Sequence, residues 1–191
     1  MKEKLSWPGS AQLAPVPAVL VGCGDGSRRN PYNLITVAWC GMACSDPPML
    51  TVGVRPERFS FGLLRRTGEF TVNLPTQALA AHLDWCGVVS GKAVDKFKER
   101  GLTAVPGEKV KAPLVGESPL SLECRVDRSL ELGSHWLFIA RILTVRVDPD
   151  LVNAEGKLDI EKAGLVTYAH GNYYALGAEL GRFGFSVRKK Q

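Results

Sequence analysis

Three short segments carry side chains whose types and spacing suit the binding of a phosphorylated ligand. In the segment VRPERFS, at Val54–Ser60, a predicted strand ends and a predicted helix begins, which supplies two guanidinium groups and a hydroxyl at one turn. Such a turn suits a phosphate, because charged donors and a helix N-terminus both attract anions. A pair of solvated arginines beside an exposed serine is the alternative that this fragment leaves open.

The second segment is SGKAVDKF, at Ser90–Phe97. Ser90 is expected to be the N-cap of a helix, with Lys96 following about one and a half turns later. A capped helix on the protein surface explains the same pattern without any ligand.

The third segment, NLITVAW at Asn33–Trp39, is expected to form a strand. Alternation places Asn33, Ile35, Val37 and Trp39 on one face, with Leu34, Thr36 and Ala38 on the other. An amide and an aromatic ring about 20 Å apart on one face suit an elongated ligand. An ordinary half-buried strand with a core tryptophan is the alternative.

Several other segments resemble known functional signatures, but their neighbouring residues do not fit those signatures. Gly22, Gly24 and Gly26 follow a strand, but the next residues cannot open a helix, so a hairpin turn is predicted instead of a dinucleotide fingerprint. The segment 87–93 lacks the first glycine and the Ser/Thr of a P-loop. The three histidines lack metal-ligand spacing and no G-x-S-x-G elbow occurs, so we expect no metal and no catalytic dyad.

The elements that must position these segments are mostly strands. Twenty glycines and twelve prolines punctuate short apolar runs, which is typical of strands joined by turns. The expected strands are 17–23, 34–42, 49–54, 69–74, 120–127, 135–148 and 165–170. The expected helices are Phe59–Arg66, Thr76–Trp85, Val94–Glu99 and, with a less regular pattern, Lys157–Lys162. The predicted fold class is therefore mostly β, a β barrel with a few α-helices outside it.

Composition limits the remaining possibilities. The 191 residues form one predicted domain, with an N-terminal extension at 1–14, a loop or edge excursion at Pro106–Pro119 and a basic tail at 188–191. The net charge of +5 is spread along the chain rather than gathered in a patch, which argues against nucleic-acid binding. No apolar run resembles a signal peptide or a membrane span, so a cytoplasmic protein is expected. Five cysteines without CxxC spacing predict neither disulfides nor structural zinc.

Nine motifs occur in one order along the chain, and together they are far more specific than any one of them. They are NLITVAW, SDPPM, VRPERFS, EFTVNLP, CGVVSGKAVDKF, GLTAVP, LECRV, ELGSHWLFIARI and LGRFGFS. In this order the chain resembles the flavin reductase-like family and, within it, the flavoredoxin branch, from about Pro15 to Val187. The resemblance implies an FMN-binding split barrel of Greek-key type that forms a homodimer, with the flavin near the subunit interface.

The resemblance also implies a set of cofactor-binding residues. The principal positions are Asn33, Trp39, Ser60, Lys96, His135 and Tyr168, and the flanking positions are Thr36, Ala38, Ser45, Arg55 and Ser90. Lys96, Ser60 and Arg55 would contact the FMN phosphate, while Trp39 would flank the ring. No catalytic residue is needed, because the flavin itself carries the chemistry. The implied function is an FMN-dependent oxidoreductase that receives electrons or hydride from NAD(P)H or a redox protein. A noncatalytic FMN carrier between proteins is the alternative.

Overall fold

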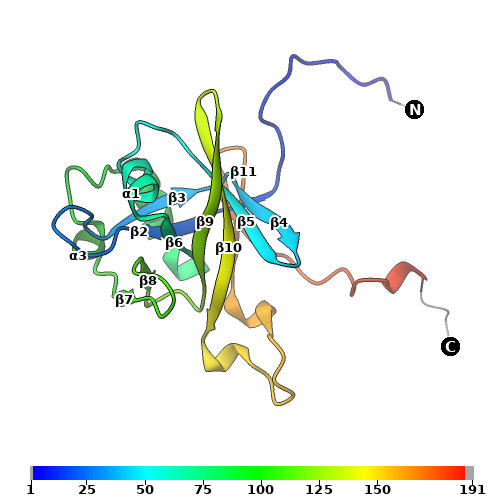
Figure 1. Ribbon diagram of the computed structural model, residues 1–191. Coiled ribbons are helices and arrows are strands. Elements are labelled where there is room, and N and C mark those ends of the chain that lie inside the picture. Colours follow the sequence, from blue (N-terminus) through cyan, green and yellow to red (C-terminus); the bar gives the residue numbers. More distant parts are fainter. Residues whose placement is uncertain (1, 188–191) are drawn as a thin grey trace.

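One antiparallel sheet of seven strands organises the chain (Figure 1), in the computed structural model that describes residues 2–187. The strand order is β3-β2-β6-β9-β10-β5-β4. The strands are β2 (Val19–Cys23), β3 (Asn33–Val37), β4 (Cys40–Ser45), β5 (Pro48–Val54), β6 (Glu69–Leu74), β9 (Leu120–Leu132) and β10 (His135–Val147). The predicted basic tail at 188–191 lies outside the described residues.

The connection between β3 and β4 shows that this sheet curls into an open barrel. The two strands are at opposite edges of the sheet, yet only Ala38 and Trp39 separate them along the chain. The edges must therefore come close together at this point, where the N–H of Gly53 in β5 donates to the Trp39 carbonyl at 2.7 Å. The predicted class, a mostly β split barrel with a few helices, is confirmed. The predicted single strand over 34–42 is wrong, because the chain bends at Ala38–Trp39 to change edges.

Both faces of the sheet are buried near β2, because successive side chains of this strand point to opposite faces. Val19 and Val21 point into the apolar cluster inside the barrel, whereas Leu20 points into a second cluster outside it. The outer cluster packs beneath α2 (Ala80–Val88) and α3 (Lys96–Arg100). Strands buried on both faces are nearly continuous in apolar residues, which is what the sequence of β2 shows. The predicted turn after β2 is confirmed, with Gly24 at φ 93°.

The helices lie close to their predicted positions. Helix α1 (Phe59–Thr67) ends at Gly68, whose φ of 66° is the left-handed geometry that commonly ends helices. The helix predicted over 76–85 begins as a 3₁₀ turn, η1 (Gln77–Leu79), and continues as α2. The other 3₁₀ turns are η2 (Pro149–Leu151), η3 (Ile160–Ala163) and η4 (Phe185–Val187). The segment 157–162 thus forms only a short 3₁₀ turn near its end.

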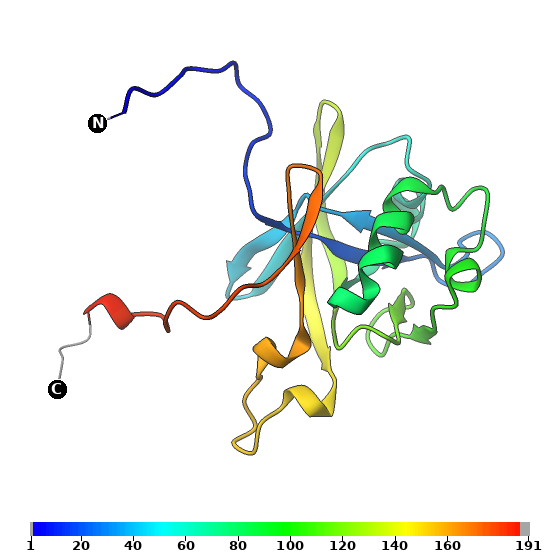
Figure 2. The ribbon, with the colours of Figure 1, turned by 180° about the vertical axis from the view of Figure 1, so that it is seen from behind.

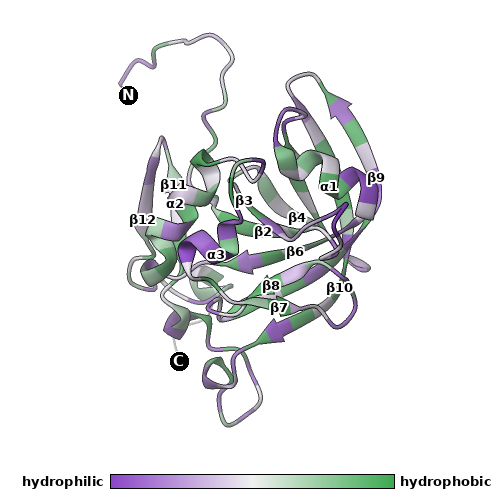
Figure 3. Cartoon of the chain, turned by 90° about the vertical axis from the view of Figure 1, so that its left-hand side faces the viewer, coloured by the Kyte–Doolittle hydropathy of each residue, from purple (hydrophilic) through white to green (hydrophobic). Residues whose placement is uncertain are grey.

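Two small sheets complete the fold. A three-stranded sheet joins β1 (Val16–Pro17), β11 (Val166–Ala169) and β12 (Asn172–Ala175), and Figure 3 shows α2 beside β11 and β12. Strand β11 confirms the prediction over 165–170. A hairpin of β7 (Ala104–Pro106) and β8 (Pro113–Val115) flanks the loop within the predicted excursion at 106–119.

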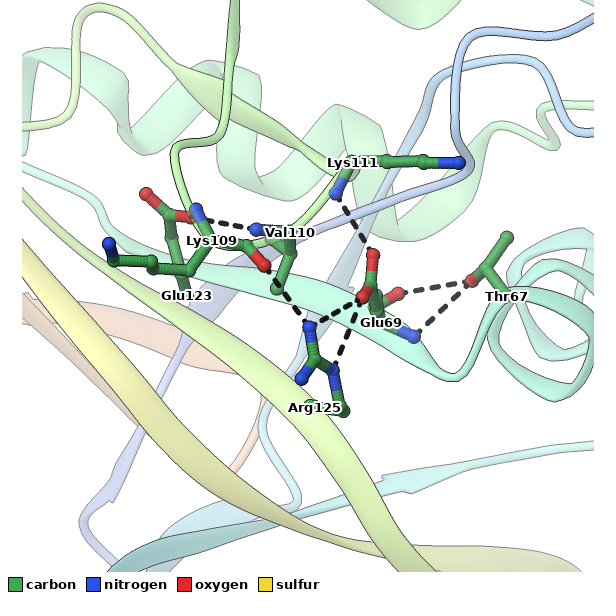
Figure 4. Close-up of polar contacts among 7 residues, drawn as sticks. All are labelled: Thr67, Glu69, Lys109, Val110, Lys111, Glu123 and Arg125. Carbon is green, nitrogen blue, oxygen red and sulfur yellow. Dashed lines mark hydrogen bonds and ion pairs between the residues drawn. The ribbon is translucent and has the colours of Figure 1, made fainter.

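Two glutamates fasten the loop of this hairpin to the sheet (Figure 4). The Glu123 side chain in β9 is fully buried, and its carboxylate accepts hydrogen bonds from the backbone N–H groups of residues 108–110 at 3.0, 2.6 and 3.1 Å. Glu69 in β6 accepts the N–H of Lys111 at 3.0 Å and pairs with Arg125 at 3.1 Å. The buried charge is therefore compensated by donors of the loop that it holds.

Both ends of the described chain extend away from the barrel (Figures 1 and 2). Residues 2–14, within the predicted N-terminal extension, contain no strand or helix, and residues 176–187 contain only η4. We call these segments the N-terminal arm and the C-terminal arm. Large apolar side chains on the arms are exposed to solvent: Leu5, Trp7, Leu13, Leu176, Leu180, Phe183, Phe185 and Val187.

Candidate functional site

Two hollows of about 150 Å³ each lie next to one another between β3, the end of β5 and the start of α1. The α1 hollow is lined by Asn33, Ile35, Glu57–Ser60, Cys86, Gly87, Val89–Gly91 and Lys96. The Trp39 hollow is lined by Ile35–Trp39, Gly53–Arg55, Arg58 and His135. Ile35 and Arg58 belong to both walls, so the two hollows are adjacent, and we call the pair the groove.

A buried ammonium group dominates the α1 hollow. Lys96 is the first residue of α3, and only 3% of it is exposed. Its Nζ donates to the backbone carbonyls of Leu34 at 2.7 Å and Cys86 at 2.6 Å. Among residues 2–187 no carboxylate forms an ion pair with it. Burial lowers the pKa of Lys96, as expected for a cation that lacks a charged partner.

Two neutral polar side chains are fixed beside this lysine. Asn33 and Ser60 are both buried, and the Asn33 Nδ2 donates to the Ser60 Oγ at 2.7 Å. The absence of a side chain at Gly91 permits this arrangement, because a Cβ there would lie 2.0 Å from the Asn33 Oδ1 and 2.9 Å from Phe59. Gly91 therefore lets the loop before α3 approach β3 closely.

The N-terminus of α1 opens into the same hollow. Its N-cap residue, Arg58, makes no side-chain cap hydrogen bond, and its first turn contains no acidic residue. The unpaired N–H groups of a helix start attract anions. A helix start, a hydroxyl and a buried ammonium thus converge on one hollow, which is the donor set that a phosphate requires.

The Trp39 hollow has a different character. Trp39 is 42% exposed, and Arg55 forms an exposed ion pair with Glu57 at 3.5 Å. His135, at the start of β10, lies on the same wall, and its Nδ1 is 2.9 Å from the Ser134 Oγ. Burial and the nearby Arg55 charge lower the pKa of His135, so its imidazole is neutral at neutral pH. An aromatic ring and neutral or cationic donors can flank a flat, polar ring system here.

The structure brings most of the predicted site residues to this groove. Asn33, Ser60, Ser90 and Lys96 line the α1 hollow, while Thr36, Ala38, Trp39, Arg55 and His135 line the Trp39 hollow. Within one chain, Ser45 and Tyr168 line neither hollow: Ser45 ends β4, and the Tyr168 ring packs against Tyr173 at a centroid distance of 5.4 Å.

Several expected roles change with the tertiary contacts. The predicted N-cap role of Ser90 is wrong: Asp95 caps α3 by accepting from the N–H groups of residues 97 and 98, and the Ser90 Oγ accepts from Lys92. The Thr36 hydroxyl donates to the Leu83 carbonyl, which ties β3 to α2. Arg55 lines the Trp39 hollow, whereas Lys96 lines the α1 hollow.

Arg58 is a charged residue that lines both hollows and that the selected set omits. The sequence signal was present, since Arg58 is the second guanidinium of the VRPERFS turn. Its guanidinium donates to the Gly87 carbonyl at 3.4 Å, which places it between the start of α1 and the end of α2.

The described part of the chain lacks both a candidate metal cluster and a candidate membrane-spanning helix. Residues 2–187 contain no cluster of three or more His, Cys, Asp or Glu side chains able to hold a metal ion. No helix among these residues has the length and apolarity needed to cross a bilayer.

Comparison with known proteins identifies the family. The Flavin reductase like domain matches residues 11–177. Flavoredoxin of Desulfovibrio vulgaris (Miyazaki F) is 34% identical in sequence and superposes with a TM-score of 0.89 over 97% of this chain and 100% of that chain. Flavoredoxin from Methanosarcina acetivorans is 29% identical, with a TM-score of 0.86 over 98% and 100% of the two chains.

A relative among curated sequences is a protein of uncharacterized function from Archaeoglobus fulgidus. It is 35% identical over 113 residues, which are 59% of this chain and 64% of the relative, slightly under two thirds of its length. The family match, by contrast, covers the whole barrel, from the last residues of the N-terminal arm to just beyond β12. The chain therefore belongs to the flavin reductase-like domain family.

Proposed function

We propose that the protein binds FMN in the groove formed by these two adjacent hollows, with the phosphate in the α1 hollow. The observation that carries this proposal is the buried Lys96 ammonium, which has two carbonyl partners and, within residues 2–187, no carboxylate partner. A phosphate would supply the missing negative charge, and Ser60 and the start of α1 would add hydrogen bonds. Burying a cation without a counterion is costly, so an anionic ligand accounts for its presence.

The ring of the flavin would then extend toward the Trp39 hollow. The two hollows are adjacent and share Ile35 and Arg58 in their walls, so the ring of a ligand anchored by its phosphate would lie near Trp39 and His135. Trp39 would flank the ring, and the neutral imidazole of His135 can donate to or accept from its polar edge. The flavoredoxin structures that superpose on the whole barrel support a flavin as the ligand class.

The proposed activity is the transfer of electrons or hydride from NAD(P)H or a redox protein to an acceptor. When bound, the flavin supplies that redox chemistry. The chain's own residues hold the phosphate, orient the ring and leave the half-exposed side at Trp39 open to a donor. The family match supports an oxidoreductase, and the choice between an enzyme and a carrier depends on the reaction with nicotinamide.

We further propose that the protein is a homodimer in which the second copy covers the two arms, with the groove near the interface and the side at Trp39 left open. The support is the number of large apolar side chains on the two arms that are exposed in a single chain, including Trp7 at 75% and Leu180 at 93%. Large exposed apolar surfaces mark interaction sites. Light scattering should give twice the chain mass, and removal of residues 2–14 should shift the protein toward monomer.

Two experiments test the proposal, the first on the cofactor and the second on the reaction. The purified protein is titrated with FMN, riboflavin and inorganic phosphate, and binding is followed by equilibrium dialysis. We expect FMN to bind more tightly than riboflavin, because only FMN reaches the α1 hollow with a phosphate. A protein that takes up no FMN would refute the proposal. Stopped-flow mixing of the FMN-loaded protein with NADH or NADPH then follows bleaching of the flavin absorbance, and negligible bleaching would indicate a carrier instead of a reductase.

A further inference from the structure

Part of the positive charge that is spread along the sequence is gathered on one side of the barrel. Basic side chains lie on or next to α1, on the loop between β2 and β3, and on the segment before α3, and Figure 1 shows these three segments on the same side of the barrel. Six of these side chains are exposed: Arg28, Arg29, Arg58, Arg65, Arg66 and Lys92. We call these six residues the basic surface.

Contacts between the three segments hold this surface together. The Arg66 Nε, at the end of α1, donates to the Asn30 Oδ1 at 2.8 Å, and Asn30 directly follows Arg28 and Arg29 in the loop between β2 and β3. Lys92, in the segment before α3, lines one hollow together with residues of the same loop. The loop therefore lies between the charges of α1 and the charge of Lys92.

Along α1 the basic surface extends to the proposed FMN groove. Positions 58, 62 and 66 lie on one side of a helix. A Cβ on Gly62 would be 3.0 Å from the Arg66 Nη1, so the Arg66 side chain lies against the helix at this glycine. Arg58, at the start of α1, lines both hollows of the groove. The distance along the helix from residue 58 to residue 66 is about 12 Å at the usual rise.

The six cations lack counter-charges within residues 2–187, because no ion pair of these residues includes any of them. Four carboxylates lie on or next to the same segments: Asp25, Glu57, Glu69 and Asp95. The two aspartates accept hydrogen bonds from backbone N–H groups, and the two glutamates form ion pairs with other arginines. A surface with this charge attracts anionic partners and accelerates their association.

The extent of the basic surface indicates an anionic protein as the partner. A phosphate or a small carboxylic acid can contact one or two of these side chains, whereas six charges on three segments match an acidic surface of similar size. Trp39, which is 42% exposed, lines the Trp39 hollow together with Arg58 and adds an aromatic side chain beside the charges. Arginine and tryptophan are enriched among the residues that contribute most to binding between proteins.

We infer that the basic surface docks an acidic redox protein that exchanges electrons with the bound flavin. This inference rests on the proposed function, in which a redox protein is one of two classes of donor. Arg58 belongs to the basic surface and to the groove, so a protein docked there lies beside the flavin site. The reduced partner gives up one electron in each encounter, and two such electrons together with protons from the solvent reduce the flavin.

The test uses an acidic iron–sulfur ferredoxin as the probe, a basic c-type cytochrome as its counterpart and a DNA duplex as a second polyanion. One variant combines three substitutions of residues that line neither hollow of the groove: Arg28→Glu, Arg29→Glu and Arg65→Glu. The control variant has the same change of charge at exposed residues on the end of β10 and in the segment 157–162, which lie away from α1 (Figure 1): Arg146→Glu, Lys157→Glu and Lys162→Glu.

Two measurements are made on wild type and on both variants, after circular dichroism has confirmed that each is folded. Calorimetry gives the affinity for the oxidised ferredoxin with and without FMN on the protein. Stopped-flow mixing of the FMN-loaded protein with chemically reduced ferredoxin gives the second-order rate of flavin bleaching.

At low ionic strength we expect the basic-surface variant to lower both ferredoxin affinity and the bleaching rate at least about tenfold, while the control variant stays within about twofold of wild type. Added salt should reduce this difference, because it screens exposed charges. FMN affinity should be equal in all three proteins.

Four results would overturn the inference. They are equal losses in both variants, which would show an effect of net charge alone, no binding of ferredoxin to wild type, binding of the cytochrome as tight as that of the ferredoxin, and tighter binding of the DNA duplex. Failure of wild type to bind FMN would instead count against the proposed function, because ferredoxin docking is also measured without FMN.

Discussion

Replacing Lys96 with methionine tests the proposed phosphate site most directly. Methionine keeps most of the buried volume and removes the charge, so the packing of α3 against β3 is largely retained. A hydrogen bond to a charged group contributes about 1.5–3 kcal/mol, which corresponds to roughly a 10- to 150-fold loss of FMN affinity. The two carbonyl bonds already hold the ammonium in place, so little side-chain entropy is lost on binding. We therefore expect a loss in the upper part of this range.

The assay is FMN binding by equilibrium dialysis, alongside thermal unfolding of the flavin-free protein. Lys98→Met is the control, because Lys98 lies on the same helix and is exposed. Riboflavin affinity should change little in Lys96→Met, since riboflavin has no phosphate. This difference between the two flavins separates a lost phosphate contact from a general disturbance of the groove.

One result would refute the assignment of the phosphate to the α1 hollow. If folded Lys96→Met binds FMN as tightly as wild type, the phosphate lies elsewhere and Lys96 has only a structural role. Equal losses of FMN and riboflavin affinity would likewise contradict it, because they would show that the variant disturbs the ring site.

Three further predictions follow from the contacts described above. Glu123→Gln should lower the free energy of unfolding by about 2–4 kcal/mol in denaturant titrations, because an amide cannot accept from all three backbone donors. Glu108→Gln is the control, because the Glu108 side chain is exposed. Gly91→Ala should reduce stability by about 1–3 kcal/mol and weaken FMN binding, since its Cβ would displace Asn33. Hydrogen bonds from Ser27 lower the pKa of Asp25 from 3.8 to about 2. The associated stabilisation is therefore present above pH 3.8 and is lost as the pH falls toward 2. The free energies of unfolding of wild type and Asp25→Asn should converge over that pH range.

The barrel and its family were predictable because their signals are local or ordered along the chain. Apolar runs bounded by glycine and proline located most strands, and the alternation of β3, with Ile35 inward and Leu34 outward, agreed with the structure. The nine ordered motifs identified the family that the comparison confirms. The positions of Asn33, Ser60 and Lys96 in one hollow also agree with the residues selected from those motifs.

Other features depended on contacts between distant segments. The strand over 34–42 has a continuous apolar pattern, yet it breaks at Ala38–Trp39 because the barrel brings its two sheet edges together there. Ser90 and Asp95 are both good N-cap residues, and only the folded path of the loop decides between them.

For the site, the sequence by itself determined which chemical groups the chain supplies, and the tertiary structure decided which of them meet. The VRPERFS turn contains two arginines, but only the barrel separates Arg55, beside Trp39, from Arg58, between the two hollows. Lys96 is an ordinary helix lysine in the sequence. It becomes a buried cation only because β3 and the end of α2 surround it with carbonyl groups, and burial arises from long-range packing that no local pattern encodes.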